Sequence, residues 1–141
     1  MSEARKILKC PICDTIVEVL DHVGVEIVCC GPAMEDVSEQ FAEGDEFDHR
    51  AIVRRVRGGL KVQVGVEPHP MCEDHYIQWV EVISGQRSCR QFLEPGQLPE
   101  AVFDVHGDDI TVRQYCSQHG LWRSDANPQM ARQFELCPAV A

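Results

Sequence analysis

The stretch Tyr115-Cys116-Ser117-Gln118-His119-Gly120-Leu121-Trp122 joins two segments of strand-like composition through a short loop. The loop carries a cysteine and a histidine, and both residue types are common metal ligands. Cys116 and His119 are three residues apart, so a thiolate and an imidazole can reach one ion together. Two ligands do not make a site, so the meaning of this stretch depends on whether the chain supplies further ligands.

The composition describes an acidic chain of 141 residues with 8 cysteines and 6 histidines. The formal net charge of −10 argues against a nucleic-acid partner, because such proteins present a basic face. No apolar core of a signal peptide follows residues 1–6, and no apolar run approaches the roughly 18 residues of a membrane span. We therefore expect a cytoplasmic protein whose cysteines are metal ligands and free thiols rather than disulfides.

The first 30 residues contain four of the cysteines in a pattern typical of a metal-binding module. Cys10 and Cys13 form a Cys-x-x-Cys knuckle, and Cys29 with Cys30 supplies two more thiolates for tetrahedral coordination of zinc or iron. A redox dithiol is the alternative, but it leaves the second pair unexplained. Because Cys29 and Cys30 are adjacent, we expect distorted geometry at the metal. The alternating segment 15–20 predicts one short strand.

The chain from residue 38 to residue 125 is predicted to form a β-sandwich. Residues 38–48 are acidic and irregular, which predicts a linker or loop. Short strand-like segments follow, separated by turn residues such as Gly58-Gly59 and Pro95-Gly96. Seven segments at this spacing predict a sandwich, with strands over residues 51–56, 60–66, 76–84, 87–93, 101–105, 110–115 and 120–123.

Three further histidines could complete a metal site with Cys116 and His119. His69 lies between two prolines, which restrict its backbone, and His75 follows six residues later. Each of these, like His49, is by itself more often a surface or hydrogen-bonded histidine than a ligand. Loops at one end of a sandwich can bring the five residues together, and the combination favours a metal centre.

The motifs around these residues resemble those of known iron proteins. The N-terminal segments Lys9-Cys10-Pro11-Ile12-Cys13 and Val28-Cys29-Cys30-Gly31-Pro32-Ala33-Met34 resemble the desulforedoxin module. The segment Pro68-His69-Pro70-Met71-Cys72-Glu73-Asp74-His75-Tyr76-Ile77-Gln78-Trp79, together with the opening stretch, resembles superoxide reductase. From about residue 8 to residue 123 the chain is therefore similar to the two-iron desulfoferrodoxins.

This resemblance implies a mainly β chain with two iron ions. A desulforedoxin-like module (1–37) would precede an immunoglobulin-like, seven-stranded β-sandwich (38–125) and a C-terminal tail (126–141). One iron would be held by four cysteines, and the other by four equatorial imidazoles and an axial thiolate. The implied ligands are Cys10, Cys13, Cys29 and Cys30 for the first iron, and His49, His69, His75, His119 and Cys116 for the second.

The resemblance also implies an activity and partners. The expected reaction is one-electron reduction of superoxide to hydrogen peroxide, with a rubredoxin-like electron donor and a homodimeric assembly. The alternatives are a non-catalytic electron-transfer or redox-sensing protein of the same fold, and a zinc-stabilised binding module with a vestigial second site.

The chain departs from the family beside His49. The family commonly carries Glu-Lys-His-x-Pro, whereas this chain reads Phe47-Asp48-His49-Arg50-Ala51. The lysine that would attract superoxide is replaced by Asp48, and Glu46 lies one step from the glutamate position. An acid beside an open iron site is expected to repel the anion. Glu46, Asp48 and Arg50 are thus candidate auxiliary residues, and we hypothesise that Arg50 or Lys61 restores the attraction.

Overall fold

The computed structural model describes residues 5–21, 24, 26–41 and 48–126. Every regular element within these ranges is a β-strand. No helix long and apolar enough to cross a membrane occurs among the described residues. The backbone divides between Glu39 and Gln40 into two compact units.

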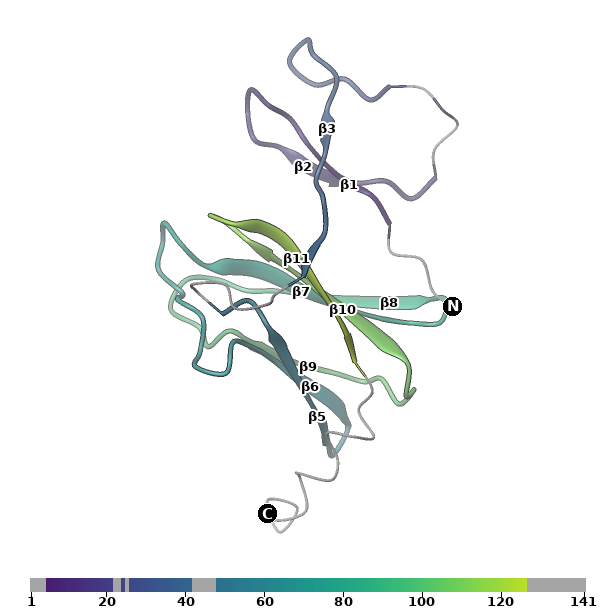
Figure 1. The fold of residues 1–141 in the computed structure, drawn as a ribbon, viewed down its shortest axis with the longest axis vertical. Helices are drawn as coiled ribbons and strands as arrows, with labels where there is room; N and C mark the ends of the chain where they lie inside the picture. The colour runs from purple at the N-terminus through teal and green to yellow at the C-terminus, as the bar shows by residue number, and fades with distance from the viewer. Residues whose placement is uncertain (1–4, 22–23, 25, 42–47, 127–141) are drawn as a thin grey trace. The chain divides into compact units, whose positions relative to one another are not determined.

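The N-terminal unit is built on a three-stranded antiparallel sheet in the order β2-β1-β3 (Figure 1). Its strands are β1 (Ile7–Lys9), β2 (Ile16–Glu18) and β3 (Glu35–Asp36). The sequence predicts the strand around β2 but misses β1 and β3, because two or three residues are too few to show alternation. Ile7 and Leu8 of β1 are buried, and the buried Cys10 directly follows this strand.

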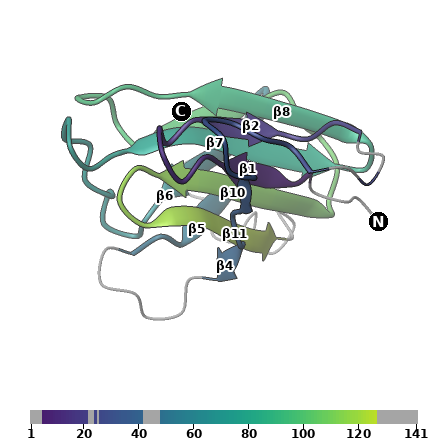
Figure 2. The ribbon, with the colours of Figure 1, turned by 90° about the horizontal axis from the view of Figure 1, so that it is seen from above.

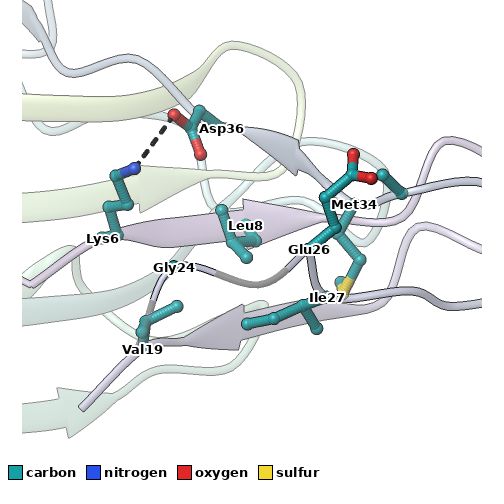
Figure 3. A pocket seen from close by; sticks show the side chains of 9 residues that line it. Lys6, Leu8, Val19, Gly24, Glu26, Ile27, Met34 and Asp36 are labelled. Carbon is teal, nitrogen blue, oxygen red and sulfur yellow. Dashed lines mark ion pairs between the residues drawn. The ribbon is translucent and has the colours of Figure 1, made fainter. Parts of the chain in front are cut away.

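The same unit contains a pocket of about 190 Å³ (Figure 3). Apolar side chains line most of it, and an ion pair between Lys6 and Asp36, at 3.4 Å, lies at one side. No cysteine lines the pocket, so it is distinct from the cysteine cluster described below.

The C-terminal unit is a β-sandwich of a five-stranded sheet, β4-β11-β10-β7-β8, and a three-stranded sheet, β5-β6-β9. Figure 2 shows β8, β7, β10, β11 and β4 following one another in the larger sheet. The strands are β4 (Gln40–Phe41), β5 (Ala51–Val56), β6 (Gly59–Val64), β7 (Ile77–Ser84), β8 (Arg87–Phe92), β9 (Glu100–Phe103), β10 (Ile110–Cys116) and β11 (Gly120–Ala126). Seven of them overlap the seven segments expected from the sequence, so the mainly β fold is confirmed.

The eighth strand, β4, is a difference from the expectation. It lies within residues 38–48, for which the sequence predicts a loop, and it pairs in parallel with β11 through Gln40 and Trp122. Both residues of β4 are exposed, so no alternation marks the strand in the sequence. β11 also continues three residues beyond the expected end at residue 123. Among the described residues the sandwich thus has one strand more than the seven expected.

The core of the sandwich lies between the two sheets. Val62 and Val64 of β6 face this core together with Val80 and Val82 of β7, and all four are fully buried. The two-residue spacing reflects the alternation of side chains along a strand. Each such valine contributes about 1.5–3 kcal/mol to stability through burial. β10 is buried along its whole length, which gives its last residue, Cys116, a rigid support.

Candidate metal centres

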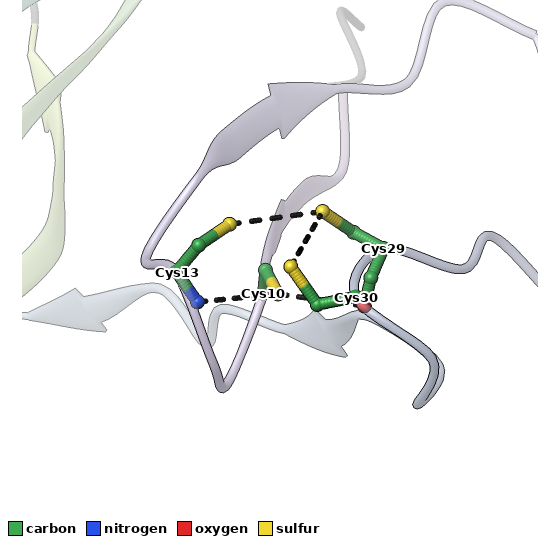
Figure 4. Close-up of side chains that lie close together, drawn as sticks. All are labelled: Cys10, Cys13, Cys29 and Cys30. Atoms are coloured by element: carbon green, nitrogen blue, oxygen red, sulfur yellow. Dashed lines mark hydrogen bonds between the residues drawn. The ribbon is translucent and has the colours of Figure 1, made fainter.

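Four cysteines of the N-terminal unit form the first candidate centre (Figure 4). The sulfurs of Cys10, Cys13, Cys29 and Cys30 all lie within 4.8 Å of one another. Cys13 Sγ is 3.7 Å from Cys29 Sγ, which is 3.8 Å from Cys30 Sγ. Four sulfurs placed tetrahedrally at about 2.3 Å from one ion lie about 3.8 Å apart. The spacing therefore fits a metal ion held by four thiolates.

The backbone brings these sulfurs together through two different turns. The N–H groups of Ile12 and Cys13 lie 3.4 Å and 3.5 Å from Cys10 Sγ, as in a cysteine knuckle. The adjacent pair reaches the cluster through a left-handed turn, with φ of 56° at Cys30 and 103° at Gly31. A non-glycine residue rarely adopts this conformation, so the unusual geometry expected for adjacent cysteines is located at Cys30.

The thiols influence one another's ionisation. Thr15 Oγ1 lies 3.0 Å from Cys13 Sγ, and hydrogen bonding from Thr15 lowers the pKa of Cys13 to about 6. The hydrogen bond with Cys13 raises the pKa of Cys29 to about 12, and Cys13 also raises the pKa of Cys30. Thiols packed so closely ionise together only when a cation offsets their charge. Thr15 is not among the residues predicted for this site, although its place two residues after a knuckle cysteine is a usable signal.

Four histidines of the C-terminal unit form a closed ring, which is the second candidate centre. The centroids of neighbouring imidazoles are 4.7 Å apart for His49 and His69, and 4.8 Å apart for His69 and His75. The ring closes with 4.9 Å between His75 and His119, and 5.3 Å between His119 and His49. His49 and His69 are buried, whereas the other two are partly exposed. Three parts of the chain thus supply the ring, with His49 in the first, His69 and His75 in the second, and His119 in the third.

Cys116 lies near the axis of this ring. Its Sγ is 3.7 Å from His69 Nε2 and 3.6 Å from His119 Nδ1, and these two histidines occupy opposite corners. His69 Nε2 is also 3.1 Å from His49 Nε2. Two nitrogens at right angles, each about 2.1 Å from one ion, lie about 3.0 Å apart. The donor atoms of His49, His75, Cys116 and His119 all lie within 4.8 Å of one another, and His69 joins them through its contacts with His49 and Cys116, so these residues could hold one metal ion.

Burial favours the neutral form of two of the imidazoles. It lowers the pKa of His69 to about 4, with a further contribution from the neighbouring histidines, and it also lowers the pKa of His75. His69 Nδ1 lies 2.8 Å from the Pro70 carbonyl oxygen, so Nδ1–H donates there and Nε2 keeps its lone pair for a metal. Neutral rings suit metal binding, because a protonated imidazole has no lone pair to offer.

The end of β10 and the turn that follows it position Cys116 and His119. The pairing of β10 with β7 shifts register between Tyr115 and Cys116, because Gln78 is an extra residue on the β7 side. Gly120, with φ of 85°, allows the tight turn into β11. Gln40 of β4 donates from Nε2 to the His119 carbonyl oxygen at 2.6 Å. The unexpected strand β4 therefore holds the turn that carries His119.

Backbone contacts fix His75 relative to the same turn. Tyr76 N donates to Ser117 Oγ at 3.0 Å, and Ser117 N donates to the Tyr76 carbonyl oxygen at 2.9 Å. His75 also exchanges two backbone hydrogen bonds with Cys72, at 2.9 Å and 3.1 Å. Cys72 itself is exposed and does not belong to either group of donor atoms.

Two further residues lie beside the ring, and the site predicted from the sequence does not include the first of them, Gln114. Gln114 is fully buried and donates from Nε2 to the His49 carbonyl oxygen. Trp122 stacks on His49, with centroids 4.2 Å apart and planes inclined by 1°. A signal for Gln114 existed, since alternation along β10 places it on the same face as Cys116.

The candidate auxiliary residues have different environments. Glu46 lies outside the described residues. Arg50 binds the carboxylate of Asp48 through Nε at 2.6 Å and through Nη2 at 2.8 Å. This ion pair lowers the pKa of Asp48 to about 2, so the carboxylate is ionised and its charge is offset. Lys61 pairs with Glu100 at 3.4 Å.

Comparison with known families identifies both units. The family described as "Desulfoferrodoxin" matches residues 49–125, and the family described as "Desulfoferrodoxin, N-terminal domain" matches residues 2–37. The superoxide reductase from Treponema pallidum has a similar fold, with a TM-score of 0.71 at 21% identity. The similarity covers 87% of this chain and 99% of that structure.

Two relatives match at higher sequence identity. A desulfoferrodoxin from Desulfarculus baarsii is 41% identical over 125 residues, which are 89% of this chain and 99% of the relative. A desulfoferrodoxin homolog from Methanothermobacter thermautotrophicus is 42% identical over 123 residues, which are 86% of this chain and 99% of the relative. The chain belongs to the desulfoferrodoxin family.

Proposed function

We propose that the chain is a superoxide reductase, which combines one superoxide, one electron and two protons into one hydrogen peroxide. The observation that carries the proposal is the ring of four imidazoles with Cys116 Sγ near its axis, 3.6 Å and 3.7 Å from two opposite corners. In this proposal the catalytic iron is held by His49, His69, His75, His119 and Cys116. Membership of the family supports the same activity.

The five donor groups suit a small anionic substrate. Iron bound there would supply the single electron. A metal ion bound there would be held by neutral imidazoles and one thiolate, so the donor set would leave part of the ion's positive charge to attract an anion. The thiolate of Cys116 would also donate electron density to a bound iron ion, which would favour electron transfer to a dioxygen species.

Superoxide has to approach from the exposed part of the ring. His49 and His69 are buried and Trp122 covers one face of His49, whereas His75 and His119 are partly exposed. Asp48 lies beside His49, but its ion pair with Arg50 offsets the charge that would otherwise repel the anion. Arg50 thus has a compensating role in this proposal, in place of the family's lysine.

The finer assignments belong to the same proposal. Residues 1–37 would form the desulforedoxin-like module, with the second iron on its four cysteines, residues 38–125 the reductase domain, and residues 126–141 a tail. A rubredoxin-like protein would return the electron, and the chain would act as a homodimer in the cytoplasm. No described cysteine forms a disulfide, which is consistent with a reducing compartment.

A non-catalytic electron-transfer or redox-sensing protein is the second candidate. The observation that favours it is Asp48, since an acid stands where the family has a cation that draws superoxide in. The two candidates differ in whether reduced protein consumes superoxide.

Stopped-flow mixing of the iron-loaded, reduced protein with superoxide tests the proposal. We expect rapid loss of superoxide in the parent and in Cys72→Ser, which replaces an exposed thiol outside the ring. Cys116→Ser should lose both this reaction and the thiolate-to-iron absorption band. A parent that carries both irons but leaves superoxide at its spontaneous decay rate would refute the reductase and favour the second candidate.

A further inference from the structure

The carboxylate of Asp48 connects two separate segments of the chain. Oδ1 accepts hydrogen bonds from Arg50 N at 3.3 Å and from Arg50 Nε at 2.6 Å. Oδ2 accepts from Arg50 Nη2 at 2.8 Å and from Val66 N, also at 2.8 Å. The bond to Val66 spans eighteen residues of sequence, from the segment before β5 to the turn after β6.

These two segments carry two of the four histidines. Asp48 directly precedes His49, and the turn after β6 leads to His69. The backbone N–H of His69 donates to the Val64 carbonyl oxygen at 3.0 Å. The backbones also touch, since a Cβ added at Gly65 would lie 2.9 Å from the Asp48 carbonyl oxygen. The Asp48 carboxylate therefore adds a side-chain connection between two segments that the backbone also joins, through the hydrogen bond from Gly65 N to the Arg50 carbonyl oxygen at 2.7 Å.

Asp48 has a backbone conformation that few residues tolerate. Its φ is 53°, in the left-handed region, where aspartate is accepted because its short side chain can bond to nearby backbone groups. The contact between Oδ1 and Arg50 N is such a bond. A lysine has donors but no acceptor, so the family's usual residue could not replace these contacts.

We infer that Asp48 is a positioning residue, whose carboxylate clamps the segments of His49 and His69 and so sets the spacing of these two candidate metal ligands. That spacing is 3.1 Å between the Nε2 atoms. The inference rests on one part of the proposed function, namely that the ring binds a metal ion. It does not require that the protein reduces superoxide. Arg50 offsets the charge of the clamp, and the bond to Val66 supplies the connection.

Metal binding by four variants tests the clamp, with cobalt(II) as the probe added to metal-free full-length protein. Asp48→Gly removes the carboxylate without strain, because glycine accepts a positive φ. Asp48→Asn keeps an acceptor for Val66 N, and Arg50→Gln removes the ion pair but leaves that acceptor. Asp104→Asn is the matched control, since Asp104 forms an exposed ion pair with His106 at 2.7 Å.

Asp48→Gly should lower the affinity of the histidine site for cobalt(II) by roughly 10- to 100-fold, as is typical for loss of a group that orients a ligand. Its thiolate-to-cobalt band should also shift, whereas the bands of the four-cysteine site stay unchanged. Asp48→Asn, Arg50→Gln and Asp104→Asn should remain close to the parent. An unchanged affinity and spectrum in Asp48→Gly would overturn the clamp, as would an equally large loss in Arg50→Gln.

Amide exchange in the metal-free protein provides a readout that needs neither metal nor superoxide. The Val66 amide should exchange faster in Asp48→Gly than in Asp104→Asn, and Asp48→Asn should restore the slow rate. Unchanged Val66 exchange in the Asp48→Gly variant would overturn the inference. If the parent fails to consume superoxide while these shifts appear, the proposed function is refuted and the clamp stands.

Discussion

The two candidate metal centres are built in opposite ways. The four cysteines lie within residues 10–30 of a small unit, and two of them, Cys13 and Cys30, are exposed. The ring of histidines draws on three separate parts of a sandwich and places His49, His69 and Cys116 in its interior. A small unit depends on its metal for stability, whereas a site inside a complete core is arranged by the fold itself.

Removal of both metals should have the largest effect, and it should affect the two units differently. The N-terminal unit has few buried apolar residues, and the fully buried Cys10 is one of them, so this unit should lose its structure without metal. The sandwich should remain folded on its own core. Amide exchange measured before and after chelation would show lost protection in β1 and β2 and retained protection in β7 and β10. Equal loss in both units would contradict the contrast.

Gln114 tests whether the sandwich arranges the histidine site through its own hydrogen bonds. Gln114→Leu leaves the buried His49 carbonyl oxygen without this donor, so the free energy of unfolding should fall by about 1–3 kcal/mol. Gln91→Leu is the control, because Gln91 is exposed and its side chain bonds only to the next residue. Denaturant titration of both variants measures the difference, and equal effects would argue against a special role for Gln114.

Substitution of the two tryptophans should have a smaller effect, and only one of the two should affect the histidine site. Trp122→Phe replaces a ring that stacks on His49, so stability should fall by about 1 kcal/mol and the spectrum of the histidine site should change. Trp79 instead stacks on Tyr115, with centroids 6.0 Å apart, and Trp79→Phe should leave that spectrum as it is. If the two variants have the same spectrum, the stacking of Trp122 on His49 does not influence the histidine site.

Thr15 provides the smallest test, this time in the four-cysteine centre. Its side chain lies 3.0 Å from Cys13 Sγ, and a hydrogen bond to a thiolate stabilises the more negative, reduced state. Thr15→Val should therefore lower the reduction potential of this centre while the potential of the histidine centre stays constant. A redox titration of the iron-loaded protein reads both potentials. An unchanged potential would show that the Thr15 contact does not act on the metal.

The parts that the sequence predicted are those with a local signature. Alternating stretches such as 60–66 and 76–84 revealed β6 and β7, because each side chain of a strand faces one side. The sequence pattern favours a metal centre at Cys116 and the histidines, but the full set of five ligands came from the family resemblance, since His49 and His69 have no local pattern that links them. Gln114 and β4 were missed because their roles depend on neighbours that the fold supplies.

Asp48 shows the limit of reasoning from the family pattern. From the sequence it is only an acid in the place of a lysine, which predicts repulsion of superoxide. In the structure its carboxylate accepts hydrogen bonds from the Arg50 side chain and from Val66 N. Its charge is thus offset and its acceptors connect two segments, and neither property can be read from the motif.

The most direct test of the account is the ratio of hydrogen peroxide formed to superoxide consumed by the reduced, iron-loaded protein. Reduction by one external electron yields one peroxide for each superoxide, whereas dismutation yields one peroxide for every two. Rapid consumption with a ratio of one is the predicted result. A ratio of one half, or no consumption by protein that contains both irons, would contradict the proposed reductase.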